Sequence, residues 1–415
     1  MGMSVYCLMY KFFKNQVLFC IGILVACLDI VMYRKRGILF HGYQGVASGN
    51  ALAFFEHLSA SHENLPKADI WWTGHSLGGL EYPKFVQTPP RGASVFRHAT
   101  YLIFLARFRV IAVAGAGDLS FYLRFLSNSR RLKVLLTHGF GLKSMGVLSP
   151  TLSPDQKRIW SNMGKRFNLL SASSKLERYI LSSTLNVDVS NVVVMGPQRD
   201  MASGQYEKSE IREARDLIKR LYGNHIDETA RIIIYAPTHR DHRSDQQSRT
   251  LFGFTSNDDL NHALSERNSY LIMRSHRFSK NNMGSGFSNL INSGDAESVD
   301  FSKLAPAAET LITDYSGIFL EYLTSEIKIG FWRYDLDDYR KERGFSISES
   351  IFKCGDDISN EQEFIRLIDM KGVSKAMMET RLDWHNQLYE LSNEAALRET
   401  SKEIAFRARI DLSKI

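Results

Sequence analysis

Short apolar runs alternate with amphipathic stretches along most of the chain. The runs are rich in β-branched residues and predict buried strands, whereas the stretches between them have one apolar face, as helices do. Strands that alternate with helices imply a parallel sheet with helices on both faces, and so an α/β fold. The first half of the chain is predicted to form strands at 37–40, 69–73, 110–115, 133–139, 168–173 and 191–196, and helices at 50–60, 101–108, 119–128 and 176–183.

The alternation starts again after a polar stretch at residues 196–205, which we predict to be a hinge. Because 415 residues exceed one ordinary domain, we predict two α/β domains, 37–198 and 199–415. A second polar stretch, 279–295, is predicted to be a mobile loop. Further strands are predicted to begin at residues 231, 269, 309 and 328, with helices at 210–223, at 258–266 and over most of the chain beyond 371.

Residues 1–36 differ in kind from the rest. An apolar run at 17–33 precedes a basic cluster at 34–36 and contains Asp29. The run is shorter than the roughly 20 residues of a membrane span. Three interpretations stay open. The segment is a marginal signal anchor or interfacial helix, a buried helix, or a stretch that results from a translation start assigned too far upstream and that is not part of the fold. The basic cluster favours a cytoplasmic location for the rest of the chain.

Composition narrows the class of partner. The net charge of +7 and the isoelectric point of about 9.1 indicate an anionic partner: a phosphorylated substrate, a nucleotide, a polyanion or an acidic membrane surface. The four cysteines show no metal-ligand spacing and no disulfide framework, which fits a reducing compartment and argues against structural zinc. No carboxylate cluster marks a metal site, so we expect no obligatory metal.

The stretch "GHSLGG" at 74–79 matches the nucleophile elbow of serine hydrolases, with Ser76 as the nucleophile. Only about 30 residues separate the preceding His41-Gly42 pair from Ser76, too few for the strand and helix that a hydrolase places there. Pro83 would also fall in the second turn of the required helix, where it removes a hydrogen bond. We therefore favour a glycine-rich turn after a buried strand.

Four later loops place polar residues at predicted strand ends, where open parallel sheets bind ligands. In the first, His138 ends an apolar strand, and Gly139 and Gly141 let the backbone approach a ligand closely. Lys143 adds a cation suited to a phosphate. The alternative is an ordinary turn in which the histidine makes its hydrogen bonds within the protein and has no catalytic role.

The second and third loops are basic. Thr238, His239 and Arg240 follow one predicted strand, and an arginine fork suits a phosphate. His276 follows the next strand and can act as a general acid or base near neutral pH. The alternative for each is a solvated basic loop.

The fourth loop lies where a strand gives way to a predicted helix. Asp314 and Ser316 stand at this point, and the backbone N–H groups of a helix start would bind an anion. Glu321 lies further along the helix and could reach a ribose. The alternative for Ser316 is a simple N-cap.

Together and in this order, the loops resemble the CDP-glycerol glycerophosphotransferase family of teichoic-acid and capsule polymerases. The matching segments are "HGFGLK" (138–143), "APTHR" (236–240), "SHRF" (275–278), "TDYSG" (313–317) and "YDLDDYRKERGF" (334–345). The chain departs from the family pattern at Phe140, Gly141, His239, Arg277 and Gly317 and in the stretch "GPQRDM" (196–201), and is therefore identified as a divergent member.

The resemblance implies a GT-B fold of two Rossmann-like domains that face each other across a cleft, here with an N-terminal apolar helix. It implies transfer of a polyol phosphate from a CDP-activated donor to an acceptor hydroxyl, with release of CMP and no obligatory cofactor. His138 and His276 are the implied catalytic residues, with His138 as the base. The implied substrate-binding residues are Lys143, Thr238, Arg240, Asp314, Ser316, Glu321 and Arg343.

The implied partners are a nucleotide-activated polyol phosphate, a lipid-linked or polymeric glycan acceptor and a membrane surface, but no nucleic acid. The implied location is the cytoplasmic face of the bacterial plasma membrane, with peripheral or single-anchor attachment. Three alternatives stay open: a GT-B glycosyltransferase that uses a sugar nucleotide, a membrane-bound hydrolase that uses Ser76, and a non-catalytic protein that binds surface polymer.

Overall fold

The chain folds into two compact units, which are described separately. The computed structural model describes residues 5–29, 35–60, 70–75, 84–90, 92–199, 203–204, 206–223, 225–238, 250–274, 287–292 and 303–410. Unit 1 comprises Met1–Phe140, Met145–Asp200 and Leu388–Ile415, and unit 2 comprises Gly141–Ser144 and Met201–Gln387. Leu388–Ile415 thus packs with the first unit, whereas the sequence pattern assigned all of 199–415 to the second domain.

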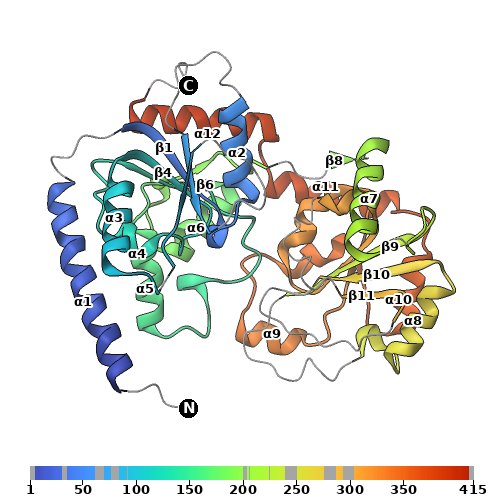
Figure 1. The fold of residues 1–415 in the computed structure, drawn as a ribbon. Coiled ribbons are helices and arrows are strands. Elements are labelled where there is room, and N and C mark those ends of the chain that lie inside the picture. The colour runs from blue at the N-terminus through green and yellow to red at the C-terminus, as the bar shows by residue number, and fades with distance from the viewer. Residues whose placement is uncertain are drawn as a thin grey trace. The chain divides into compact units, whose positions relative to one another are not determined.

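Unit 1 is built on a parallel sheet, which in its described part has seven strands in the order β3-β2-β1-β4-β5-β6-β7. The strands are β1 (Lys35–His41), β2 (Ile70–Gly74), β3 (Phe85–Gln87), β4 (Phe108–Val113), β5 (Leu132–Leu135), β6 (Leu169–Ala172) and β7 (Val192–Val194). The helices are α1 (Val5–Leu28), α2 (Gly49–Ala60), α3 (Val95–Ala106), α4 (Ser120–Leu123), α5 (Pro154–Gly164), α6 (Lys175–Leu185) and α12 (Asn393–Ala408) (Figure 1).

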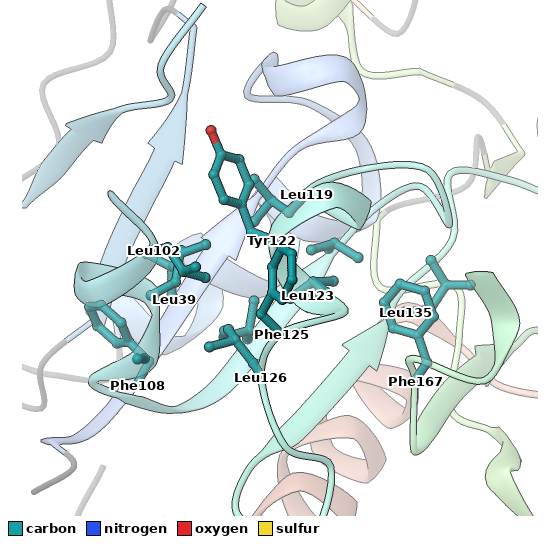
Figure 2. Packing of buried hydrophobic residues seen from close by; sticks show 14 of the residues in the cluster. Leu39, Leu102, Phe108, Leu119, Tyr122, Leu123, Phe125, Leu126, Leu135 and Phe167 are labelled. Atoms are coloured by element: carbon teal, nitrogen blue, oxygen red, sulfur yellow. The ribbon is translucent and has the colours of Figure 1, made fainter. Parts of the chain in front are cut away.

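Both faces of this sheet are buried, as the near-continuous apolar strands predict. Successive side chains of a strand point to opposite faces, so Phe40 of β1 packs in the cluster that includes α2 and α12, whereas Leu39 packs in the cluster that includes α3 and α4. Figure 2 shows residues of the second cluster, with Leu39 beside Leu102, Leu135 beside Phe167, and Leu123 between the two pairs. The two layers hold the carboxyl ends of the strands in fixed positions.

Helix α1 packs against unit 1 through one side. Val25 lies in the core beside α3, and the buried Asp29 forms a fully buried ion pair with Arg131. A helix is therefore present where an apolar helix is expected, and the described part of it after Asn15 is partly buried. Among the described residues, no helix has the length and hydropathy needed to cross a membrane.

Unit 2 has a second parallel sheet, which in its described part has six strands in the order β11-β10-β9-β12-β14-β15. These are β9 (Arg231–Ala236), β10 (Ser269–Met273), β11 (Leu290–Asn292), β12 (Ala308–Thr313), β14 (Lys328–Phe331) and β15 (Asp356–Asp357); β8 (Ser203–Gly204) pairs separately with β13 (Thr324–Ser325). The helices are α7 (Lys208–Tyr222), α8 (Asn257–Ser265), α9 (Leu336–Glu342), α10 (Glu361–Asp369) and α11 (Lys375–Leu388).

The polar stretch 279–295 is not a loop throughout. Strand β11 lies inside it and pairs with β10 at the edge of the sheet, because Leu290 is buried in the unit 2 core. The prediction of a loop is wrong for these three residues, and the rest of the stretch as far as residue 286 and beyond 292 lies outside the described residues.

Candidate active site

The candidate site residues of unit 1 follow the carboxyl ends of neighbouring strands. His138 follows β5, Asp118 follows β4, and Tyr43 lies in the short 3-10 helix η1 (Tyr43–Gly45) after β1. Because β1, β4 and β5 are adjacent in the sheet, these loops share one edge. The predicted site residue His138 thus shares this edge with Tyr43 and Asp118, and its role stays a prediction.

His138 sits on a strained loop. Thr137 has a φ of 59° and Gly139 a φ of 147°. A β-branched residue in the left-handed region is an outlier that persists only when its surroundings enforce it, and such strain is concentrated at functional sites. Here Arg199 donates a hydrogen bond from Nη2 to the His138 carbonyl oxygen at 3.2 Å. The imidazole of His138 stacks on Tyr43, with ring centroids 4.2 Å apart and planes at 21°.

His41, the histidine of the His-Gly pair after β1, has a structural role. Its side chain is buried, and Nδ1 lies 3.0 Å from the carbonyl oxygen of Thr73 on the adjacent strand. Burial lowers the pKa of His41 to about 4. The imidazole is therefore neutral near pH 7. Its contact with the Thr73 carbonyl joins β1 to β2, which is a structural role and not one in proton transfer.

Packing explains the first glycine of the "GHSLGG" motif. A Cβ on Gly74 would lie 2.4 Å from the carbonyl oxygen of Gly45. The same oxygen accepts a hydrogen bond from the backbone N–H of His75 at 2.9 Å. Glycine is thus required by the close approach of the β1 and β2 loops. Ser76 lies outside the described residues.

In unit 2, Asp314 ties two of the predicted loops together. Its Oδ1 accepts hydrogen bonds from the backbone N–H of Thr238 at 2.8 Å and of Tyr315 at 2.5 Å. Asp314 is 1% exposed and Thr238 is 7% exposed. The hydroxyl of Thr238 is buried without a hydrogen-bond partner among the described residues. Buried hydroxyls are normally paired, so this one is suited to a ligand that supplies the missing partner.

The predicted helix after Ser316 differs from expectation. Gly317–Tyr322 forms the 3-10 helix η9, and within the described structure the Ser316 side chain makes no capping hydrogen bond. The predicted helix is thus a short 3-10 helix with Ser316 at its N-cap position, and anion binding at its start stays a prediction. Glu321 lies on η9 and contributes to raising the pKa of Tyr206, after burial and Glu210.

Lys143 and Arg343 lie near each other in the backbone pairing of unit 2. Lys143 forms an antiparallel bridge with Phe345, and the Ser144 N–H donates to the Gly344 carbonyl at 3.2 Å. Arg343 is the C-cap residue of α9, and its N–H donates to the Tyr339 carbonyl at 2.8 Å. The two predicted cations therefore belong to paired segments that lie far apart in the sequence.

Sequence reasoning missed the aromatic support of this region. The Tyr315 and Tyr339 rings stack with centroids 3.9 Å apart, and the Tyr315 hydroxyl donates to Asp335 Oδ1 at 3.0 Å. The signal was present in the tyrosines of the "TDYSG" and "YDLDDY" segments. This stack fixes the Asp314 loop against α9.

Two predicted site residues, Arg240 and His276, lie outside the described residues, as do His239 and Arg277. Within the described ranges, no group of three or more histidine, cysteine, aspartate and glutamate side chains could hold a metal ion.

Two parallel sheets with helices on their faces and polar loops at their strand ends define the class: an α/β protein with two parallel-sheet units. Residues 24–398 match the family model described as CDP-glycerol:poly(glycerophosphate) glycerophosphotransferase. The chain belongs to this family and is a transferase, so the resemblance drawn from its loops is confirmed.

Relatives agree with this assignment. The chain is 26% identical over 184 residues to a teichoic acid poly(ribitol-phosphate) polymerase of Bacillus spizizenii, covering 44% of this chain and 28% of the relative. It is 28% identical over 223 residues to a teichoic acid poly(glycerol phosphate) polymerase of Staphylococcus epidermidis, covering 50% of this chain and 29% of the relative. The match thus spans less than a third of each curated relative.

The fold is also similar to that of a solved protein. A structure of the wall teichoic acid polymerase TagF superposes with a TM-score of 0.71 over 97% of this chain and 98% of that chain, at 18% identity. At this identity the likeness establishes the fold alone.

Proposed function

We propose that this protein transfers glycerol phosphate, or a related polyol phosphate, from a CDP-activated donor to a hydroxyl of a cell-surface polymer or its lipid-linked precursor, releasing CMP. Family membership supports the reaction class, and the two curated relatives are named for ribitol phosphate and glycerol phosphate. The observation that carries the proposal is the presentation of His138 on a strained loop at the carboxyl end of a parallel strand.

In the proposed reaction His138 acts as the base. Its imidazole takes the proton of the acceptor hydroxyl, and the acceptor oxygen attacks the donor phosphorus that carries the polyol. The bond from that phosphorus to the oxygen of CMP breaks, and CMP leaves with the electron pair. A new phosphodiester joins the polyol phosphate to the acceptor. The protein contributes positioning and neutralisation of charge on the phosphoryl group in flight.

Unit 2 is the proposed donor side. The buried Thr238 hydroxyl is suited to donate to or accept from the nucleotide, because it has no partner among the described residues. Asp314 orders the loops around it, Ser316 lines the same segment, and Glu321 is proposed to contact the ribose. Arg240 and His276 are proposed to bind the donor phosphates, with Lys143 and Arg343 as further cations. We propose no obligatory metal, and turnover should then continue in excess EDTA.

The membrane surface is the proposed location of the acceptor. Phe19, Ile23 and Leu24 are exposed on α1 and form an apolar stripe on a helix docked to unit 1, in which Phe19 also contacts the Phe125 ring. Such a stripe on a basic protein fits the interface of an anionic bilayer. Leu24→Asp should weaken flotation with vesicles that contain phosphatidylglycerol, whereas Leu382→Asp on α11 of unit 2, also an exposed leucine, should not. Equal flotation of both variants would exclude this attachment.

The test is CMP release from CDP-glycerol by the purified protein with membrane extract as acceptor source. Acceptor-dependent release that is lost in His138→Ala and kept in Ser76→Ala is expected. CDP-ribitol and sugar nucleotides are the next donors. Release of UDP from a sugar nucleotide alone would instead identify a glycosyltransferase, and polymer binding without turnover of any donor would contradict an enzymatic role.

A further inference from the structure

Tyr43 contacts the proposed base although it belongs to a different loop. The Tyr43 and His138 rings stack at 4.2 Å with an interplanar angle of 21°. Tyr43 follows β1 and His138 follows β5, and β4 lies between these strands in the sheet. The stacked pair therefore bridges the end of β4, whose own loop carries Gly115 and Asp118.

The loop of β4 supports Tyr43 from a second side. A Cβ on Gly115 would lie 2.9 Å from Cδ2 of Tyr43 and 2.7 Å from Oδ2 of Asp118, so the ring and the carboxylate both lie against this glycine. Asp118 Oδ1 accepts a hydrogen bond from the backbone N–H of Gln44 at 3.2 Å. Gln44 has a φ of 52°, a conformation that such a bond helps to hold.

The phenol of Tyr43 is unsuited to act as a base. Burial, followed by the charge of Asp118, raises the pKa of Tyr43 above its usual value. The hydroxyl therefore stays protonated at neutral pH. Tyr43 instead presents the flat face of its ring to His138. The residue as a whole is 39% exposed, so solvent reaches it.

Stacking suits a base whose ring nitrogens must stay accessible for proton transfer. Proton transfer uses the lone pair in the plane of the imidazole, whereas Tyr43 covers a face of the ring and leaves its edge. The terminal torsion of histidine is broad, so contact with a flat partner narrows the orientations that the ring explores. An error of about 1 Å in placing a reacting group costs roughly 100-fold in rate.

We propose that Tyr43 is a positioning residue for His138, holding the plane of the imidazole by stacking, and that Gly115 and Asp118 hold Tyr43 in turn. This inference rests on the proposed role of His138 as the base. Its structural half, the orientation of the imidazole, is measurable without any substrate.

The first arm of the test is NMR of the full chain labelled with ¹³C-histidine, with His138→Gln used to assign the signal. Stacking on Tyr43 should shift the His138 ring protons upfield through the ring current. Tyr43→Phe should keep this shift and Tyr43→Leu should lose it. An unchanged spectrum in Tyr43→Leu would overturn the stacking, whatever the activity of the protein.

The second arm is steady-state CMP release from CDP-glycerol. Tyr43→Leu should lower kcat roughly 10- to 100-fold with little change in the KM for the donor, and Tyr43→Phe should stay near the wild-type rate. Tyr179→Leu, a control at an exposed tyrosine of α6, should have no effect. An unchanged kcat in Tyr43→Leu, or equal losses in the Phe and Leu variants, would overturn the proposal.

Gly115→Ala provides a second route should Tyr43→Leu fold poorly. Its methyl group would press on Asp118 and on the Tyr43 ring while the stacking partner itself is kept. The same loss of ring-current shift and kcat is expected. If the wild-type protein released no CMP but showed the expected ring-current shift, the proposed function would be contradicted. The NMR arm alone would then decide whether Tyr43 positions the His138 ring.

Discussion

Asp314 accepts a hydrogen bond from the Thr238 N–H at 2.8 Å and thereby joins the loops that follow two adjacent strands, β9 and β12. The same Oδ1 atom accepts from the N–H of Tyr315. One buried carboxylate thus holds both of these described loops of the proposed donor side. Asp314 therefore holds the conformation of these two loops whether or not it contacts the CDP-activated donor substrate.

Substitutions of Asp314 should show whether it stabilises the protein by accepting hydrogen bonds or by carrying a negative charge. Asp314→Ala leaves two buried N–H groups without their acceptor, and each should lower the free energy of unfolding by about 1–3 kcal/mol. Asp314→Asn keeps an acceptor oxygen and should lose less. Urea unfolding measures both, with Asp258→Ala on the exposed start of α8 as the control. Equal stability of the Ala and Asn variants would contradict this role.

His41 should make the protein sensitive to mild acid. Below pH 6.5 the unfolded chain takes up a proton on this histidine that the folded protein refuses until about pH 4, so the free energy of unfolding falls with pH in that window. The full effect is roughly 3 kcal/mol. His41→Gln should flatten this part of the pH profile, measured by urea unfolding between pH 7 and pH 4. A parallel profile in the variant would show that His41 is protonated in the native state.

The buried pair of Asp29 and Arg131 should anchor α1. Asp29→Ala leaves the buried guanidinium uncompensated and should cost about 3–5 kcal/mol, with faster hydrogen exchange in α1. The exposed pair of Asp155 and Arg158 on α5 is the matched control, and Asp155→Ala should cost less than about 1 kcal/mol. If the two variants lost the same stability, the ion pair would not be the anchor.

The "GHSLGG" motif should respond to packing and not to loss of a nucleophile. Gly74→Ala places a methyl group against the Gly45 carbonyl oxygen and should destabilise the protein by roughly 1–3 kcal/mol. Gly92→Ala has open space around its Cβ and should be close to neutral. Ser76→Ala should keep CMP release. Labelling by a fluorophosphonate that disappears in Ser76→Ala would instead support the hydrolase.

The strands that could be predicted are those whose own composition specifies them. β9 reads as a run of isoleucines and is buried on both faces, so its sequence suffices. β3 and β11 have three residues each and lie at sheet edges, where the partner strand decides their conformation. Pairing of this kind is a tertiary effect that local sequence does not encode.

The candidate site was predictable only in part for a similar reason. His138 stands out because a histidine between an apolar strand and two glycines is unusual. Tyr43 does not stand out, because its importance lies in a contact with a residue from another strand end. The aromatic residue directly after the first His-Gly pair was its available signal. The turn after Ser316 was predicted as an α-helix start, and the tighter 3-10 geometry of η9 was not visible in its composition.

The packing of α12 into unit 1 has a consequence during synthesis. Leu397 and Ile404 pack in the core cluster that contains Phe40 of β1 and Phe54 of α2, and Thr400 donates to the Met195 carbonyl at 2.8 Å. These residues leave the ribosome only after the whole of unit 2. The unit whose strands are translated first is therefore the last to close its core, and its apolar face must wait, shielded or chaperoned, until translation of α12 is complete.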